Sequence, residues 1–246
     1  MLQIEIAAER LFSFLGFPVT NTLVTAWVAA AVLAAVALVI AKGVKLIPAP
    51  VQNVFEILVE GLLGIMASLF GSRERAEQYL PLIATLFVFI LASNWLGIFP
   101  GVGSIGFYET HDGKEVFIPL FRSAASDLNL TIVLAVAAVL FANVSGARAL
   151  GVGTHLKKFF SFANPINFFV GILELISEFA KIISFSMRLF GNIFAGEVLL
   201  VITSFLAPFG APIPFLMLEV FVGFVQALVF AMLTMVFTSI AVAEHH

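Results

Sequence analysis

The sequence predicts an all-α polytopic membrane protein, a single domain over residues 1–246 with about five membrane-embedded helices and one interfacial amphipathic helix. Three observations indicate this fold class. Hydrophobic residues make up 61% of the chain and charged residues 11%, against about 45–50% and about 25% in soluble domains. The mean hydropathy is +1.13. Several segments reach the roughly 20 apolar residues that a membrane-crossing helix needs. This composition excludes an ordinary soluble enzyme, a nucleic-acid-binding protein and a disordered protein.

Missing residues and motifs limit the chemistry of the chain. It contains no cysteine, which excludes disulfides, thiolate metal sites and cysteine nucleophiles. It also lacks the HExxH and GxxxxGK[ST] motifs. We therefore expect no catalytic residue, no metal site and no cofactor, and any nucleotide chemistry belongs to a partner.

The first span is expected at residues 19–41, which are rich in Ala and Val. Residues 51–70 differ, because polar side chains recur at helical spacing along one side of the segment, at Gln52, Asn53, Glu56 and Glu60. Apolar side chains occupy the other side. This pattern predicts an amphipathic helix that lies in the membrane interface.

Two further spans are expected at residues 81–100 and 127–147. Asn94 and Trp95 lie near the far end of the first of them, where they are interpreted as interface residues. The connection between the two spans, residues 101–126, is rich in glycine and predicts a loop.

The last two helices are expected at residues 167–206 and 214–243, joined by the proline-rich turn APFGAPIP. The first has 40 residues without an internal proline, which as an α-helix is about 60 Å long. The hydrocarbon core is only about 30 Å thick. Such a helix must break, protrude or tilt strongly, and a steep tilt fits a helix that runs along the flank of another membrane object.

Lysine and arginine are unevenly distributed among the connections, which predicts the orientation. Seven lie in the loops after the first span, before the second and after the third: Lys42, Lys45, Arg73, Arg75, Arg148, Lys157 and Lys158. Only Lys114 and Arg122 lie between the second and third spans. The positive-inside rule therefore predicts that the N-terminus is outside and the C-terminus cytoplasmic.

The long helix over 167–206 carries ionisable residues, which are costly in a bilayer and usually mark ion pathways. At 100° per residue a polar stripe falls within about 40° of one line, and consists of Glu174, Ser177, Lys181, Ser184, Arg188, Asn192 and Ala195. Glu197 points to the opposite side. On the final helix Glu219 and Gln226 share a face, so Glu197 and Glu219 are candidates to face each other.

The alternatives differ from residue to residue. An interfacial salt-bridge cluster is the second interpretation of Glu174, Glu178 and Lys181, because their spacing suits ion pairs on one helix. A glutamine such as Gln226 also often joins membrane helices by hydrogen bonds. Arg188 differs from these, since it lies in an apolar run with no acid within four residues.

The segment Ser184–Glu197, SFSMRLFGNIFAGE, closely resembles the signature of subunit a of the F-type ATP synthase membrane sector. The final helix from Glu219 to Gln226 fits the same family, as does Ser126-Asp127-Leu-Asn129 at the start of the third span. The resemblance covers essentially the whole chain.

The resemblance implies a proton-conducting stator in a bacterial inner membrane. Arg188 matches the essential arginine of the family, and Asn192, Glu197 and Gln226 match polar channel positions. Glu219 falls where some bacterial relatives carry histidine. Polar family positions that would line the half-channels align with Glu174, Glu178, Lys181, Ser184 and Asp127. The implied partners are a c-subunit ring with a membrane-embedded carboxylate, b-type subunits of the peripheral stalk, the remaining F1Fo subunits and the lipid bilayer.

The residues themselves agree with this function. Two polar clusters open to opposite faces and Arg188 lies between them, so its permanent charge would block a direct proton leak. The coupling ion is expected to be H⁺, because no dense cluster of oxygen ligands for Na⁺ is present. An ion-coupled secondary transporter and a purely structural membrane subunit are the competing interpretations. A transporter would show internal repeats, and a structural subunit would not need Arg188.

Overall fold

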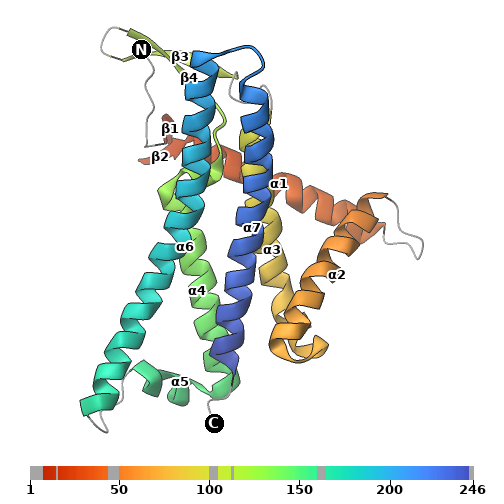
Figure 1. Cartoon of the computed structure of the whole chain (residues 1–246), viewed down its shortest axis with the longest axis vertical. Helices are drawn as coiled ribbons and strands as arrows, with labels where there is room; N and C mark the ends of the chain where they lie inside the picture. The colour runs from red at the N-terminus through yellow and green to blue at the C-terminus, as the bar shows by residue number, and fades with distance from the viewer. Residues whose placement is uncertain are drawn as a thin grey trace.

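The computed structural model describes residues 8–14, 16–43, 50–99, 105–111, 114–159 and 165–243. Within these ranges the structure is dominated by six long helices (Figure 1). They are α1 Asn21–Lys42, α2 Pro50–Phe70, α3 Arg73–Ile98, α4 Leu128–Leu150, α6 Pro165–Leu206 and α7 Pro212–Val242, and a short helix, α5, covers Val152–Phe159. All six long helices are long and apolar enough to cross a membrane. The predicted class, an all-α polytopic membrane protein, is confirmed.

The number of helices of spanning length is one higher than the five expected, because α2 also qualifies. Its Leu62, Leu63, Met66 and Phe70 are buried against the rest of the bundle. Glu56 and Glu60 lie on its exposed side. The predicted amphipathic pattern of residues 51–70 holds only in part, because Gln52 of the polar side is buried and Val54 and Leu69 of the apolar side are exposed. An interfacial position for this helix stays a prediction.

Helix α3 begins eight residues before the expected span, at Arg73 instead of Pro81. The side chain of Ser72 caps it by accepting a hydrogen bond from the backbone N–H of Arg75. The polar residues before Pro81 therefore form the first turns of the helix. Pro81 lies inside the helix, where its missing N–H removes one backbone hydrogen bond. The expected end of the span, Pro100, lies outside the described residues.

Two antiparallel hairpins were not expected. The first pairs β1 (Arg10–Phe14) with β2 (Phe17–Thr20), and the second pairs β3 (Gly106–His111) with β4 (Lys114–Pro119). The second lies in the connection predicted to be a loop, and a 3₁₀ turn, η2 (Ala124–Ser126), follows it. Both hairpins are found at the same end of the molecule as the turn between α6 and α7 (Figure 1).

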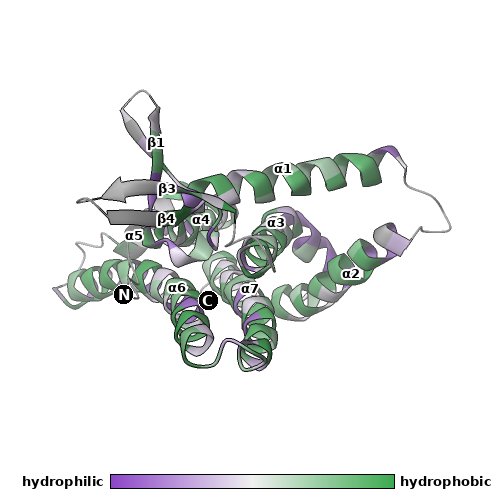
Figure 2. Cartoon of the chain, turned by 90° about the horizontal axis from the view of Figure 1, so that it is seen from above, coloured by the Kyte–Doolittle hydropathy of each residue, from purple (hydrophilic) through white to green (hydrophobic). Residues whose placement is uncertain are grey.

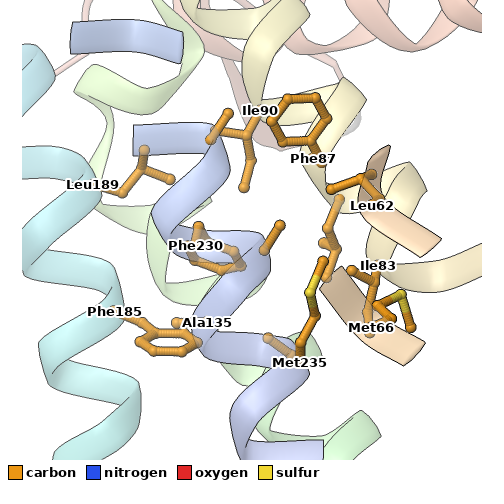
Figure 3. Close-up of a cluster of buried hydrophobic side chains, with 14 of the residues drawn as sticks. Leu62, Met66, Ile83, Phe87, Ile90, Ala135, Phe185, Leu189, Phe230 and Met235 are labelled. Atoms are coloured by element: carbon orange, nitrogen blue, oxygen red, sulfur yellow. The ribbon is translucent and has the colours of Figure 1, made fainter. Parts of the chain in front are cut away.

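Helix α7 contacts α2, α3, α4 and α6. The apolar core lies along one side of it, with Phe230 and Met235 of α7 facing side chains of α2, α3 and α6 (Figure 3). The interface of α7 with α3 also has polar contacts. The side-chain amide of Asn94 donates to the carbonyl of Gly223 at 3.1 Å, and Trp95 Nε1 donates to that of Val220 at 3.1 Å. Asn94 is fully buried against α7, so it joins two helices, and its position near the membrane interface stays a prediction.

Helix α6 is continuous over 42 residues, so it does not break. It is inclined to α7, and the two helices diverge away from their connecting turn (Figures 1 and 2). Five of its residues are buried: Gly171, Phe185, Ser186, Leu189 and Ile193. One long face of α6 is therefore available for lipid or a partner.

Candidate functional site

The polar stripe of α6 lies on its exposed surface. Ser184, Arg188 and Asn192 are all exposed. The Arg188 guanidinium lies 3.5 Å from Ser184 Oγ through Nη2, and the Asn192 amide donates to the Arg188 carbonyl at 3.0 Å. Among the residues that the structure describes, Arg188 has no carboxylate partner. The stripe thus presents a permanent cation on an open face.

A groove of about 250 Å³ runs along this stripe between α6 and α7. Its lining combines polar groups of α6 with apolar groups of α7, namely Ser177, Ala180, Lys181, Ser184, Phe185, Arg188, Leu233 and Phe237. Beside it, Gln226 and Arg188 line a narrow crevice with no room for a water molecule. Arg188 is therefore next to Gln226 and open to one side.

Four polar side chains from three helices meet toward the α5 end of α6. Lys181 Nζ lies 2.6 Å from Glu178 Oε1, so the predicted alternative of a salt bridge is present. Asn143 Nδ2 on α4 donates to Glu178 Oε2 at 2.9 Å and to the Val139 carbonyl at 3.0 Å. His155 Nε2 of α5 lies 3.2 Å from Asn143 Oδ1.

The donors in this network are determined by counting hydrogens. The two amide hydrogens of Asn143 bond to Glu178 and to the Val139 carbonyl, and its Oδ1, which carries no hydrogen, can only accept. His155 must then donate through Nε2. The network stabilises Glu178 with two donors beside a cavity of about 90 Å³ that Asn143, Glu178 and Lys181 line. Sequence reasoning missed Asn143 and His155, although an asparagine inside an apolar span was a usable signal.

At the opposite end of α6, Glu197 forms an ion pair with Arg122, in the segment that follows β4. Arg122 Nε lies 3.0 Å from Glu197 Oε2, and the two side chains are 14% and 22% exposed. The backbone N–H of Arg122 donates to Thr25 Oγ1 on α1 at 3.2 Å. Sequence reasoning counted Arg122 only as a loop charge.

Glu219 of α7 lies beside Gly196, the residue that precedes Glu197. The side chain is 4% exposed. A Cβ at Gly196 would approach Glu219 Oε1 to 2.8 Å, so the missing side chain makes room for the carboxylate. Glu197 is close enough to interact with Glu219 electrostatically. The structure thus brings together the two acids that the sequence suggested would face each other.

Several buried polar atoms around α3 and α7 lack a hydrogen-bond partner within the described part of the chain: Ser93 Oγ, Asn94 Oδ1, Ser123 Oγ and Glu219 Oε2. Such atoms are normally satisfied by protein or by ordered water. Asn94 of α3 and Glu219 of α7 lie near each other, because Asn94 donates to the carbonyl of Gly223, which is one helical turn after Glu219. The acid pair is therefore set among further polar groups.

The two remaining predicted residues are Asp127 and Glu174. Asp127 caps α4, because its Oδ1 accepts from the backbone N–H of Asn129 at 2.9 Å and its Oδ2 from Thr22 Oγ1 at 2.9 Å. A capping role explains this residue, and its place in a half-channel stays a prediction. Glu174 is partly exposed near the beginning of α6, one turn before Glu178.

Comparison with known proteins finds similarity along nearly the whole chain. A family profile described as ATP synthase A chain matches residues 23–239. The ATP synthase subunit a of Syntrophobacter fumaroxidans is 33% identical over 242 residues, 98% of this chain and 92% of the relative. That of Campylobacter fetus is 33% identical over 222 residues, 87% and 88% of the two chains. That of Moorella thermoacetica is 31% identical over 236 residues, 96% and 97%.

Proposed function

This chain belongs to the ATP synthase A chain family, and from that premise we propose that it translocates protons as the stator of a rotary F-type ATP synthase. Membership of the family makes it a membrane subunit of a multi-subunit complex. In the proposal, the exposed face of α6 lies against a ring of c-subunits, each with a carboxylate in the membrane. Protons reach and leave this carboxylate through two half-channels.

The observation that carries the proposal is the exposed Arg188. A cation that faces hydrocarbon is costly, and no described carboxylate of the chain compensates it. Most of the rest of the α6 surface is also uncovered. A partner helix with a carboxylate at the level of Arg188 would neutralise this cation and cover the exposed face of α6.

The polar groups on either side of Arg188 support two offset half-channels. On one side lie Glu197 and Glu219, with the unpartnered polar atoms of Ser93 and Asn94 nearby. On the other side, Ser184 and Lys181 line the groove beside α7, Glu178 lines the neighbouring cavity, and Glu174 lies one turn further along α6. Asn192 and Gln226 flank Arg188 itself.

Arg188 separates the two half-channels by its charge. Arginine stays protonated under ordinary conditions, so it neither accepts a proton nor lets one hop across it. It attracts an ionised carboxylate of the ring and releases it when a proton arrives. The ring must then rotate to carry its proton from one half-channel to the other.

The proposed assembly lies in a bacterial inner membrane, with the N-terminus outside and the C-terminus cytoplasmic. Both ends of the chain, residues 1–7 and 244–246, are outside the described residues. The peripheral stalk would hold the chain through b-type subunits, while the remaining F1Fo subunits carry the nucleotide chemistry. In this proposal the chain itself carries out no chemistry other than proton transfer.

The test replaces Arg188 and measures ATP synthesis in intact vesicles and proton flux in vesicles stripped of the catalytic head. Arg188→Ala is expected to abolish synthesis and to allow passive leak. Arg188→Lys keeps a cation but loses the planar guanidinium, so it should limit leak better than alanine and still impair turnover. Arg148→Ala, an exposed arginine at the end of α4, is the matched control and should behave as wild type. Normal synthesis in Arg188→Ala would remove the proposal.

A further inference from the structure

We propose that Arg122 is a positioning residue for Glu197, and that Thr25 of α1 in turn positions Arg122. This inference rests on the proposed function, because it assigns both residues a role toward an acid of the proposed proton path. Arg122 does not accept or pass on the translocated proton in this scheme. It acts by holding the Glu197 carboxylate in one place.

The ion pair itself is specific and largely shielded. The Arg122 Nε–Glu197 Oε2 distance is 3.0 Å, and less than a quarter of either side chain is exposed. A pair that is partly buried is screened less than one at a surface. A glutamate side chain has three rotatable bonds, so an anchored arginine selects one of many positions for its carboxylate.

The backbone of Arg122 is anchored by a hydroxyl with a defined direction. Thr25 Oγ1 donates its one hydrogen to the Asn21 carbonyl at 3.0 Å. The same oxygen is then left to accept from the Arg122 N–H, at 3.2 Å. Thr25 is 1% exposed, so water does not compete for this bond.

The segment around Arg122 is attached to the same end of α1 at two further points. Asn21 Nδ2 donates to the Pro119 carbonyl at 3.3 Å, and Thr22 Oγ1 donates to Asp127 Oδ2 at 2.9 Å. Asn21 and Thr22 are buried like Thr25. Three buried polar residues at the beginning of α1 thus hold the chain before, at and after Arg122. An arginine that only faced water from a loop would not need such attachment.

The two acids of this end therefore have different roles. Glu197 is held by Arg122, whereas Glu219 Oε2 has no hydrogen-bond partner within the described residues. A carboxylate that is held in place, next to one with an oxygen free of hydrogen bonds within the described residues, suits a relay in which the proton passes between Glu197 and Glu219. Without Arg122, Glu197 would keep its hydrogen bonds with the Ser126 side chain and the Ser123 backbone but would lose the cation that holds its carboxylate.

The experiment measures proton flux in head-stripped vesicles of the whole complex, with incorporation of the chain quantified by immunoblot. Arg122→Gln should slow flux by about tenfold, as expected for a displaced reacting group. Arg122→Lys, which keeps a cation, should restore flux to within about threefold of wild type. Arg148→Gln is the control for the loss of an arginine and should leave flux unchanged.

The link to Glu197 is tested by a double-mutant cycle of Arg122→Gln and Glu197→Gln. If Arg122 acts through Glu197, the double variant should be no slower than the slower single variant. Reductions that multiply would show independent action and overturn the proposal. Full flux in Glu197→Gln alone would instead contradict the relay role of Glu197 in the proposed function, whereas a slow Glu197→Gln with multiplying reductions contradicts only the positioning role.

Thr25→Val removes the anchoring hydroxyl at nearly constant volume, and Thr131→Val is its control. Thr131 is equally buried, but its hydroxyl bonds only within its own helix, to Leu128. Thr25→Val should slow flux severalfold with normal incorporation, and Thr131→Val should not. If the Arg122→Gln chain is not incorporated into the complex, the comparison of Thr25→Val with Thr131→Val takes its place. Equal flux in these two variants overturns the proposal.

Discussion

Gly196 determines how closely α6 and α7 approach at the acid pair. It is followed by Glu197, and the place of its missing side chain is taken by the Glu219 carboxyl group, whose Cδ lies 3.0 Å from the position of a Cβ. That separation is shorter than ordinary van der Waals contact. Any larger residue must displace Glu219 or the helix that carries it.

Gly196→Ala is therefore expected to lower proton flux severalfold while the chain still enters the complex. Alanine favours a helix over glycine by about 1 kcal/mol, so the loss arises from displacement of the carboxylate and not from a weaker helix. Gly64→Ala on α2, where a Cβ meets nothing within 4 Å, is the control. Flux in vesicles measures both, and equal flux in the two variants would contradict the steric argument.

The network of His155, Asn143, Glu178 and Lys181 is held together by one amide. Asn143→Leu, which keeps the branched shape of the side chain, removes the donor to Glu178 and the acceptor for His155. Leaving a buried partner unsatisfied costs about 1–3 kcal/mol. We expect a lower melting temperature of the purified complex. Asn129→Leu, at an exposed position of the same helix, should change it little, and a stability unaffected by Asn143→Leu would show that the network contributes nothing.

The residues that could be selected from the sequence are those that contrast with their neighbours along the chain. Arg188 and Glu219 lie in apolar runs, and the Glu178–Lys181 pair follows from spacing on one helix. Arg122 and Asn143 were missed because their partners lie 75 and 35 residues away. Periodicity describes one helix at a time and does not show which side chains of different helices meet.

Helices α3 and α7 are in close contact because Gly223 lies between them. A Cβ there would be 3.2 Å from Asn94 Cβ and 3.6 Å from the Trp95 ring. Asparagine and tryptophan then reach the α7 backbone through their N–H groups. A glycine in the middle of a helix, unfavourable by itself, is explained here by this packing.

Gly223→Leu is expected to separate the two helices and to lower the melting temperature of the purified complex. Overpacking of a core typically costs about 1–3 kcal/mol, and both hydrogen bonds would lengthen as well. Gly61→Leu, at a position on α2 with no neighbour within 4 Å, is the matched control. A melting temperature no lower than that of the control would argue against the close α3–α7 contact.

At the scale of elements, apolar length predicted the helices, but it did not predict how they begin or what joins them. Helix α3 extends back to Arg73 because Ser72 caps it, and a cap depends on one side chain and not on hydropathy. The β3–β4 hairpin was missed because short strands carry little signal in a glycine-rich connection. The direction of α1, strongly inclined to α3 and α7 (Figure 1), depends on contacts with η2 and α3.

Over the whole molecule, the two ends differ in their basic residues. The beginning of α3, the end of α4 and helix α5 lie together at one end, whereas the hairpins and the α6–α7 turn lie at the other end (Figure 1). The first group of elements contains Arg73, Arg75, Arg148, Lys157 and Lys158, whereas the hairpins contain Arg10 and Lys114, and Arg122 follows β4. The excess at the first end has the same sign as the distribution on which the predicted orientation rests.

Cysteine labelling tests the orientation directly, because the chain has no cysteine of its own. Val152→Cys on α5 and Tyr108→Cys on β3 introduce thiols at exposed positions of opposite ends. A membrane-impermeant maleimide should label position 152 from the cytoplasmic side and position 108 from outside. The reverse pattern would invert the two half-channels. Gly113, another candidate for the outer position, lies outside the described residues.

The contacts of α7 have a consequence for biosynthesis. A ribosome makes this helix after α2, α3, α4 and α6, and all four pack on it. Until residues 212–242 have been made, the earlier helices have only their contacts with one another, chiefly those of α4 with α6 and of α2 with α3. Nascent chains stalled before residue 212 should therefore be cut more readily by membrane proteases than chains that include the 31 residues of α7, because synthesis of this helix separates an inserted chain from a packed one.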